Sequence, residues 1–277
     1  MNTVFKTLKK NKIIYGTWRR AKLFARRIVH LKYNNYPGLH GRISHRDGMF
    51  SGDIRHYMSV GDSAIANIES ALKAAGKSLS SSKSILDIPS GHGRVLRLLA
   101  ANVSPDQITA CDLDEDGIEF CAKEFGCKKI LSNRDLSKIH FPENYSLIWV
   151  GSLFTHVDEA PFADLLKLLF NSLEPDGVLV FTTHGKFSVE VFDRYWKWDA
   201  NGVPLSNAQL QKELAKNKGF YYAPYYNSKE YGISISLAPY VTSLIESLFK
   251  GKAKVIFFNE KGWDDHQDVF AIQKVNE

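Results

Sequence analysis

The feature that most constrains the fold is a short apolar run that ends in a glycine turn and passes directly into a helix pattern. Residues 84–97 read Ser-Ile-Leu-Asp-Ile-Pro-Ser-Gly-His-Gly-Arg-Val-Leu-Arg, with glycines at 91 and 93. Glycine lets a backbone turn tightly and approach a ligand, so this order is typical of the strand–loop–helix unit of nucleotide sites. The stretch therefore predicts an α/β protein with a ligand at this turn.

Two absences narrow the kind of ligand. A dinucleotide fingerprint has a third glycine five residues after the first, and that position is Leu96. A phosphate-binding P-loop needs Gly-Lys-Ser/Thr, which this turn lacks. We therefore expect a ligand that has a nucleoside part but no pyrophosphate.

A second apolar run, residues 108–111, ends at Asp112, nineteen residues after Gly93. A carboxylate at the tip of the next parallel strand can accept hydrogen bonds from ribose hydroxyls, so we expect Asp112 at the ligand site. With this residue the pattern resembles the class I S-adenosylmethionine-dependent methyltransferases, whose first motif is acidic-x-Gly-x-Gly-x-Gly. Here the motif reads Asp87-Ile-Pro-Ser-Gly-His-Gly93, with Pro89 in place of the first glycine.

The resemblance implies S-adenosylmethionine as the cofactor. Asp112 and Leu113 would hold the ribose and cover the adenine, and Asp135 would read the adenine amino group. The residues that the resemblance implies around the cofactor are Asp87, Ser90, Gly91, Gly93, Asp112, Leu113, Asp135, Leu136 and Gly151. Residues 145–150 match the family's fourth strand, although Ser146 stands where the family usually has Asp.

Strand and helix patterns alternate through this region, after a helical lead-in over 50–76. They are predicted over 84–88, 94–101, 107–112, 115–125, 128–131, 145–150, 160–172 and 177–183, then over 239–249, 253–258 and 268–274. The fold class implied is α/β, a Rossmann-like doubly wound sheet of seven mostly parallel strands. Family members typically have an antiparallel last strand. The resemblance covers residues from about 55 to 275.

The charge of the chain is divided unevenly. Residues 1–46 hold twelve Lys or Arg and no Asp or Glu, whereas the remaining residues hold 24 basic and 30 acidic side chains. The whole chain has a net charge of +6, and residues 47–277 have one of −6. We therefore divide the chain into a basic N-terminal arm, 1–46, and a methyltransferase domain, 47–277.

The arm has a helical pattern of apolar residues, namely Ile14, Trp18, Ala21, Ala25 and Ile28, with arginines on the other side. Such a helix could lie on an anionic membrane surface through residues 1–34, or it could pack on the protein's own body. Nucleic-acid binding and organelle targeting are further options. The pattern does not favour nucleic acid as a partner.

Residues 185–237 interrupt the α/β alternation and form an aromatic-rich insertion. Its aromatic residues include Trp196, Trp198, Tyr221, Tyr222, Tyr225, Tyr226 and Tyr231. An insertion after the fifth strand lies beside the cofactor mouth, so it could form an acceptor-binding lid whose rings stack on a sugar or another flat ligand. The alternative is a satellite core under a long loop.

Two histidines follow strand ends near the expected cleft, and His is the side chain best suited to take a proton near neutral pH. We predict His156 as the general base and His184 as an acceptor-positioning residue or alternate base. Asp158 could orient His156, and His92 could contact the cofactor. His266 receives no role.

Two sequence features that this chain lacks narrow the chemical class of the methyl acceptor. The Asn/Asp-Pro-Pro-aromatic sequence typical of enzymes that methylate base amines is replaced by Gly151-Ser-Leu-Phe-Thr155, and no nucleophilic Cys stands there. We predict O-methylation of a small-molecule or glycan hydroxyl, as on a surface polysaccharide. The alternatives are a non-catalytic methyltransferase-like module that binds a partner enzyme, and an RNA methyltransferase.

Cys111, Cys121 and Cys127 fit no metal or disulfide spacing, so we expect buried thiols in a reducing cytoplasm and no metal site. No apolar stretch approaches the ~20 residues that span a bilayer, and no secretory leader is apparent. We therefore expect a cytoplasmic protein with an optional peripheral membrane association. The oligomeric state is left open.

Overall fold

The computed structural model describes residues 39–195, 205–225, 228 and 231–275. The amphipathic pattern of the basic arm, and the insertion residues Trp196, Trp198 and Tyr226, lie outside the described residues. None of the described helices is both long and apolar enough to cross a membrane.

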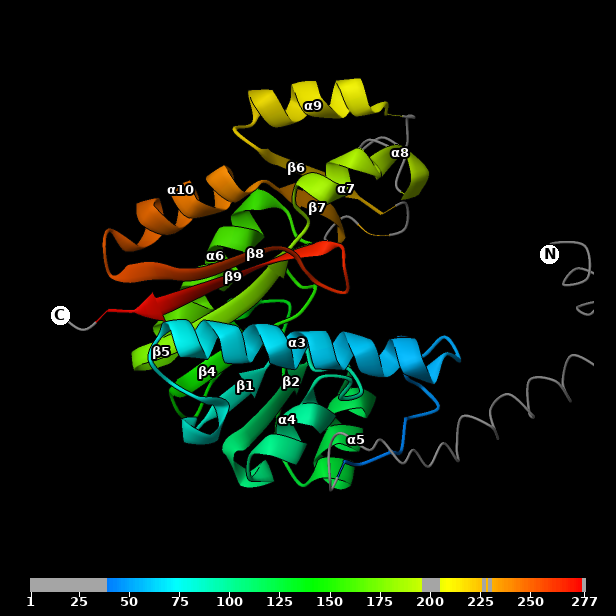
Figure 1. Cartoon of the computed structure of the whole chain (residues 1–277), viewed down its shortest axis with the longest axis vertical. Helices are drawn as coiled ribbons and strands as arrows, with labels where there is room; N and C mark the ends of the chain where they lie inside the picture. The colour runs from blue at the N-terminus through cyan, green and yellow to red at the C-terminus, as the bar shows by residue number, and fades with distance from the viewer. Residues whose placement is uncertain (1–38, 196–204, 226–227, 229–230, 276–277) are drawn as a thin grey trace, which may run out of the picture.

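The centre of the fold is a seven-stranded sheet (Figure 1). Its strands are β1 (Ile85–Asp87), β2 (Ile108–Asp112), β3 (Lys128–Leu131), β4 (Tyr145–Val150), β5 (Leu173–Thr183), β8 (Ala253–Trp263) and β9 (Gln267–Lys274). Their order across the sheet is β3-β2-β1-β4-β5-β9-β8. Strand β9 runs antiparallel to the other six strands. This confirms the predicted Rossmann-like sheet with an antiparallel last strand.

Helices cover both faces of the sheet because its strands are apolar on both sides. On β5, Val178 and Val180 face one core cluster, while Leu179 and Phe181 face the other. The first cluster includes α3 (Ile54–Ala74), α4 (Leu96–Asn102) and α5 (Glu115–Phe125), and the second includes α6 (Glu159–Asn171) and α10 (Ala238–Phe249). Short 3-10 turns are η1 (Leu79–Ser81), η2 (Pro105–Gln107) and η3 (Leu136–Lys138).

Three predicted boundaries differ from the structure by four residues or more. The lead-in helix begins at Ile54 and not at residue 50, because the Asp53 side chain caps it by accepting from two backbone N–H groups. The fifth strand begins at Leu173 and not at 177, because the chain pairs with Tyr145 before a register shift. The eighth strand continues to Trp263, five residues beyond the expected end, as half of a hairpin with β9.

The last residues assigned to the basic arm pack on the domain. Ile43 is part of the core, and the fully buried guanidinium of Arg97 donates to the carbonyl oxygens of His40 (3.0 Å) and Arg42 (3.1 Å). The same side chain donates to Gly93 O at 3.1 Å, which joins this segment to the glycine turn.

The described part of the insertion contains α7 (Lys186–Glu190), α8 (Phe192–Tyr195), α9 (Asn207–Lys216) and a hairpin of β6 (Phe220–Pro224) and β7 (Gly232–Ser236). Figure 1 shows these elements together at one end of the molecule. They bury a small apolar cluster of their own, as the satellite-core alternative expects. Strand β7 also donates backbone hydrogen bonds to Thr155, His156 and His184, so it lies against the ends of β4 and β5.

Candidate functional site

The glycine turn joins β1 to α4 at the carboxyl edge of the parallel strands. Gly91 and Gly93 have φ values of 50° and 79°, in the left-handed region that favours glycine. A Cβ on Gly93 would lie 2.5 Å from Phe125 Cε2 and 3.2 Å from Cys121 Sγ, whereas one on Gly91 would meet nothing within 4 Å. Gly93 is therefore needed for packing, and Gly91 faces open space.

Asp112 connects the tip of β2 to this turn. Its carboxylate accepts from the backbone N–H of Gly91 at 2.7 Å and of Asp114 at 2.9 Å. Each carboxylate oxygen keeps a further lone pair, so Asp112 can still accept hydrogen bonds from hydroxyl groups of a ligand.

A cavity of about 1040 Å³ opens beside Asp112, at the ends of β1 to β4. Four residues that the resemblance implied line it: Asp112, Leu113, Asp135 and Leu136. The Leu113 side chain is 51% exposed, as a residue that is to cover a flat ring would be in the absence of that ring. The volume is at the upper end of the range usual for small-molecule and cofactor sites.

The Asp135 carboxylate forms hydrogen bonds and an ion pair within its own turn. Its Oδ1 accepts from the backbone N–H and the hydroxyl of Ser137, and its Oδ2 pairs with Lys138 at 3.1 Å. These contacts, with Ser137 first, hold the pKa of Asp135 below its usual value. The role predicted for Asp135 toward an adenine amino group stays a prediction.

Three polar atoms at the turn are buried without a hydrogen-bond partner among the described residues: Asp87 Oδ2, Ser90 Oγ and His92 Nε2. The Asp87 side chain is 2% exposed, and burial, followed by the nearby Asp112 charge, raises its pKa well above the ordinary value. Buried polar groups in native proteins are nearly always satisfied, so this cluster offers hydrogen-bonding groups that a polar ligand could satisfy.

Arg94, which the sequence analysis did not single out, is a mostly buried cation beside the same turn. Its guanidinium lies 5.5 Å from the ring centroid of Trp263 and donates no hydrogen bond within the described part of the chain. Burial lowers its pKa, while Asp264 and Asp87 raise it from a distance. An arginine directly after the second glycine of the turn was the signal that could have indicated it.

Gly151 lies outside this cavity. A Cβ there would be 2.9 Å from the Trp263 ring and 3.1 Å from Trp149 Nε1. Its lack of a side chain therefore allows two tryptophan rings to pack over the end of β4, and its predicted contact with the cofactor stays a prediction.

His156 lies between the cavity wall and the insertion. Its Nδ1 is 2.8 Å from Gly232 O, an acceptor, so Nδ1 carries the hydrogen and Nε2 has the lone pair. Its ring stacks on Tyr231, a cavity residue, with 4.6 Å between centroids. Burial lowers its pKa, so the imidazole is neutral at pH 7 and able to accept a proton. Asp158 does not orient it but caps α6 by accepting from Glu159 N.

His184 is 4% exposed, and its Nδ1 lies 3.1 Å from Ser234 O of β7. Burial, with smaller contributions from His156 and His266, lowers its pKa to about 3. The contact with Ser234 O gives His184 a place in the packing of β7 on β5, and its predicted role as an acceptor-positioning residue or alternate base stays a prediction.

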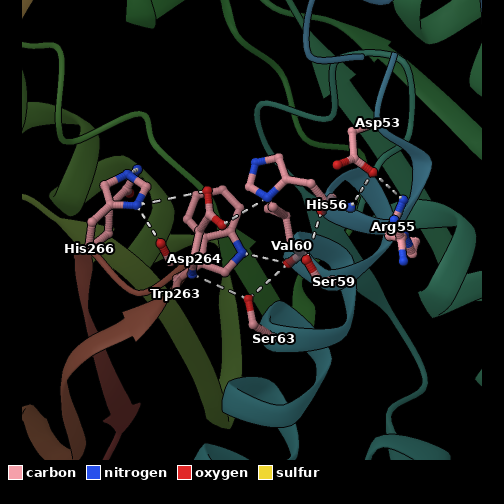
Figure 2. Close-up of polar contacts among 10 residues, drawn as sticks. Asp53, Arg55, His56, Ser59, Val60, Ser63, Trp263, Asp264 and His266 are labelled. Atoms are coloured by element: carbon pink, nitrogen blue, oxygen red, sulfur yellow. Dashed lines mark hydrogen bonds and ion pairs between the residues drawn. The ribbon is translucent and has the colours of Figure 1, made fainter. Parts of the chain in front are cut away.

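A second polar network, which the sequence analysis also missed, joins α3 to the turn between β8 and β9 (Figure 2). Trp263 Nε1 donates to Val60 O at 2.8 Å, and Asp264 N donates to Ser63 Oγ at 3.4 Å. The Asp264 carboxylate points toward both His56 and His266, at 3.7 and 3.8 Å (Figure 2). No group of three or more His, Cys, Asp or Glu side chains within the described ranges could hold a metal ion.

The comparisons with known proteins agree with this geometry. Residues 85–177 match the family model described as a methyltransferase domain. No curated protein sequence matches the chain significantly.

Solved structures share the fold at low identity. The 1,6-didemethyltoxoflavin-N1-methyltransferase of Burkholderia thailandensis, with bound S-adenosylhomocysteine, has a TM-score of 0.52 at 14% identity, over 81% of this chain and 82% of that one. The plantazolicin methyltransferase BpumL has a TM-score of 0.52 at 12% identity, over 82% and 88%. A methyltransferase from Clostridium acetobutylicum has a TM-score of 0.50 at 14% identity, over 82% and 94%.

The family match spans the glycine turn, the strand tip with Asp112 and the fourth strand. The chain therefore contains a methyltransferase domain over residues 85–177, and its fold is that of S-adenosylmethionine-dependent methyltransferases.

Proposed function

We propose that this methyltransferase transfers a methyl group to a hydroxyl oxygen of a small-molecule or glycan acceptor. One observation supports the cofactor part of the proposal. Asp87 Oδ2 is buried without a hydrogen-bond partner among the described residues, beside Asp112 and an open cavity. S-adenosylmethionine supplies an electrophilic methyl group on a sulfonium, and its amino-acid end brings one ammonium and one carboxylate.

The residues at the turn fit these groups. Asp87 would pair with the ammonium, because its Oδ2 is buried without a hydrogen-bond partner among the described residues. Arg94, a mostly buried cation beside the same turn, would pair with the carboxylate. Asp112 would accept from the ribose hydroxyls, and Leu113 would cover the adenine. Gly91 leaves the space that the ligand needs.

His156 is the proposed general base. It is neutral at pH 7, and its Nε2 makes no hydrogen bond to a described residue. An oxygen nucleophile must lose its proton during methylation, and a neutral imidazole with an available lone pair can take that proton. Orienting the acceptor against the methyl group removes a further ~7–11 kcal/mol of the barrier.

Among the solved structures named above, the 1,6-didemethyltoxoflavin-N1-methyltransferase acts on nitrogen by its name, and BpumL is a plantazolicin methyltransferase. The absence of the Asn/Asp-Pro-Pro-aromatic sequence in this chain supports oxygen instead. Residues 1–34 of the basic arm would hold the enzyme reversibly at an anionic membrane surface in the cytoplasm, close to lipid-linked sugars.

The first experiment is calorimetry with S-adenosylhomocysteine. Wild-type protein should bind it with micromolar affinity, and Asp112→Ala should weaken binding by about tenfold or more, because a charge-assisted hydrogen bond is lost. The exposed Asp106→Ala is the matched control and should bind as wild type does. No binding by wild-type protein, or full binding by Asp112→Ala, would contradict the cofactor site.

The second experiment identifies the acceptor. Wild-type protein is incubated with cofactor labelled in the methyl group and with fractionated small-molecule and glycan extracts. A labelled product in which the new methyl is on oxygen supports the proposal. Label on nitrogen, or in the RNA fraction alone, contradicts the predicted acceptor while leaving the cofactor site intact.

A further inference from the structure

Three imidazole rings stand in a row over the carboxyl edge of the sheet. The centroid of His184 lies 6.3 Å from that of His156 and 6.2 Å from that of His266. The middle ring is buried, whereas the His266 side chain is 35% exposed. His156 is the proposed base, so His266 is the accessible ring of the row that has no assigned role.

The turn between β8 and β9 holds His266 in one orientation. Its Nδ1 lies 2.7 Å from Asp264 O, which can only accept, so Nδ1 carries the hydrogen and Nε2 has the lone pair. The Asp264 carboxylate adds a charge near Nδ1, at 3.8 Å. Asp264 and Asp265 have φ values of 51° and 56°, unusual for non-glycine residues. Hydrogen bonds to α3 stabilise this turn (Figure 2).

The lone pair of His266 faces the side-chain amide of Gln267, which links it to Ser152. Gln267 Nε2 is 3.3 Å from His266 Nε2, and the same amide donates to Ser152 Oγ at 2.7 Å. Ser152 directly precedes Leu153, a cavity residue. A 3.3 Å contact is longer than a usual N–H hydrogen bond, so a ligand donor could replace the amide at little cost.

The neighbouring turn residues also lie close to the expected position of the methyl donor. Trp263 packs under the guanidinium of Arg94, and Asp264 acts electrostatically on the same guanidinium. Under the proposed function Arg94 binds the amino-acid end of the cofactor. The turn that carries His266 is therefore joined, through Trp263 and Asp264, to the side chain proposed to bind the cofactor.

We propose that His266 is an acceptor-binding residue, oriented by Asp264, whose Nε2 accepts a hydrogen bond from an O–H or N–H group of the methyl acceptor. This proposal rests on the proposed function. It gives to His266 the acceptor-positioning role that the sequence analysis assigned to His184, and it makes Asp264 a positioning residue.

The test uses full-length protein, labelled cofactor and a dilution series of the extract fraction that becomes labelled. His266→Ala should require about tenfold more of this fraction for half-maximal rate, with the maximal rate within about threefold of wild type, because an acceptor hydrogen bond is lost. His266→Gln, whose side-chain oxygen can still accept, should recover most of this affinity. Asp264→Asn should show a smaller loss of affinity than His266→Ala.

Two controls separate this role from a structural one. His56→Ala removes the other imidazole beside Asp264, on the opposite side of that carboxylate, and should leave the rate and the half-saturation unchanged. Affinity for S-adenosylhomocysteine, measured by calorimetry, should be the same in every variant to within about twofold.

His266→Ala that behaves as wild type would overturn the proposal, and so would a parallel loss of S-adenosylhomocysteine affinity or a His266→Gln as impaired as His266→Ala. Wild-type protein that binds no S-adenosylhomocysteine, or labels no fraction, would instead refute the proposed function, and this proposal with it.

Discussion

Asp87 is a buried carboxyl group that the free protein does not satisfy. Its Oδ2 lacks a partner among the described residues, and burial raises its pKa. The folded state therefore binds this proton more tightly than the unfolded chain does. The stability associated with the protonated group is present at low pH and is lost as the pH rises above the unfolded value of about 3.9 toward the folded one.

Asp87→Asn should therefore stabilise the free protein and weaken the cofactor site. At pH 7.5 its free energy of unfolding should exceed that of wild type by about 1–3 kcal/mol, since no charge is buried unpaired, and the difference should shrink toward pH 4.5. Affinity for S-adenosylhomocysteine should fall by about tenfold, because the partner of the ammonium is lost. Urea unfolding at the two pH values and calorimetry check both halves. A less stable variant, or one that binds as wild type does, would contradict this account of Asp87.

At the scale of an element, the turn between β1 and α4 uses its two glycines for different purposes. Both have positive φ, but only Gly93 is enclosed, by Phe125 and Cys121 of α5. The packing of α5 against the turn thus depends on Gly93, whereas Gly91 leaves room on the ligand side.

Alanine at the two positions should separate stability from binding. Gly93→Ala combines the left-handed φ with overpacking and should cost about 2–5 kcal/mol of stability, whereas Gly91→Ala should cost about 1–2 kcal/mol, for φ alone. Gly91→Ala should nevertheless bind S-adenosylhomocysteine more weakly than its small loss of stability suggests, because its Cβ enters the open space. Chemical unfolding and calorimetry of both variants decide this. Equal stability losses, or unimpaired binding by Gly91→Ala, would contradict the division.

At the scale of the whole molecule, the charge is divided between the arm and the domain. Residues 1–34 hold ten Lys or Arg and no acidic residue, while residues 47–277 have a net charge of −6. Each basic residue near an anionic membrane surface contributes about 1 kcal/mol, so the arm rather than the domain would provide binding to such a membrane.

Deletion of residues 1–34 should abolish co-sedimentation with vesicles rich in phosphatidylserine and leave S-adenosylhomocysteine affinity unchanged. The described contacts of the segment before α3 begin at residue 39 and would be retained. Neutral phosphatidylcholine vesicles are the control and should sediment neither form. Equal binding of both forms to the anionic vesicles would remove the membrane proposal.

Much of the fold could be predicted because its signals are local. Apolar runs and the glycine turn locate the strands and helices to within a few residues. The early start of β5 could not be predicted, since it depends on pairing with Tyr145 across the sheet. Asp112, Leu113, Asp135 and Leu136 line one cavity because parallel strands bring their carboxyl ends to the same edge, and their roles toward a cofactor stay predictions.

The sequence by itself determined the order of elements, the glycine turn and the strand-tip carboxylate, because glycine geometry and apolar periodicity act within a few residues. Only the tertiary structure decided the burial, orientation and tautomers of the three histidines. Strand β7 buries His184, the β8–β9 turn orients His266, and Gly232 sets the tautomer of His156. Burial and pKa depend on neighbours from distant segments, and a single stretch of chain does not contain that information.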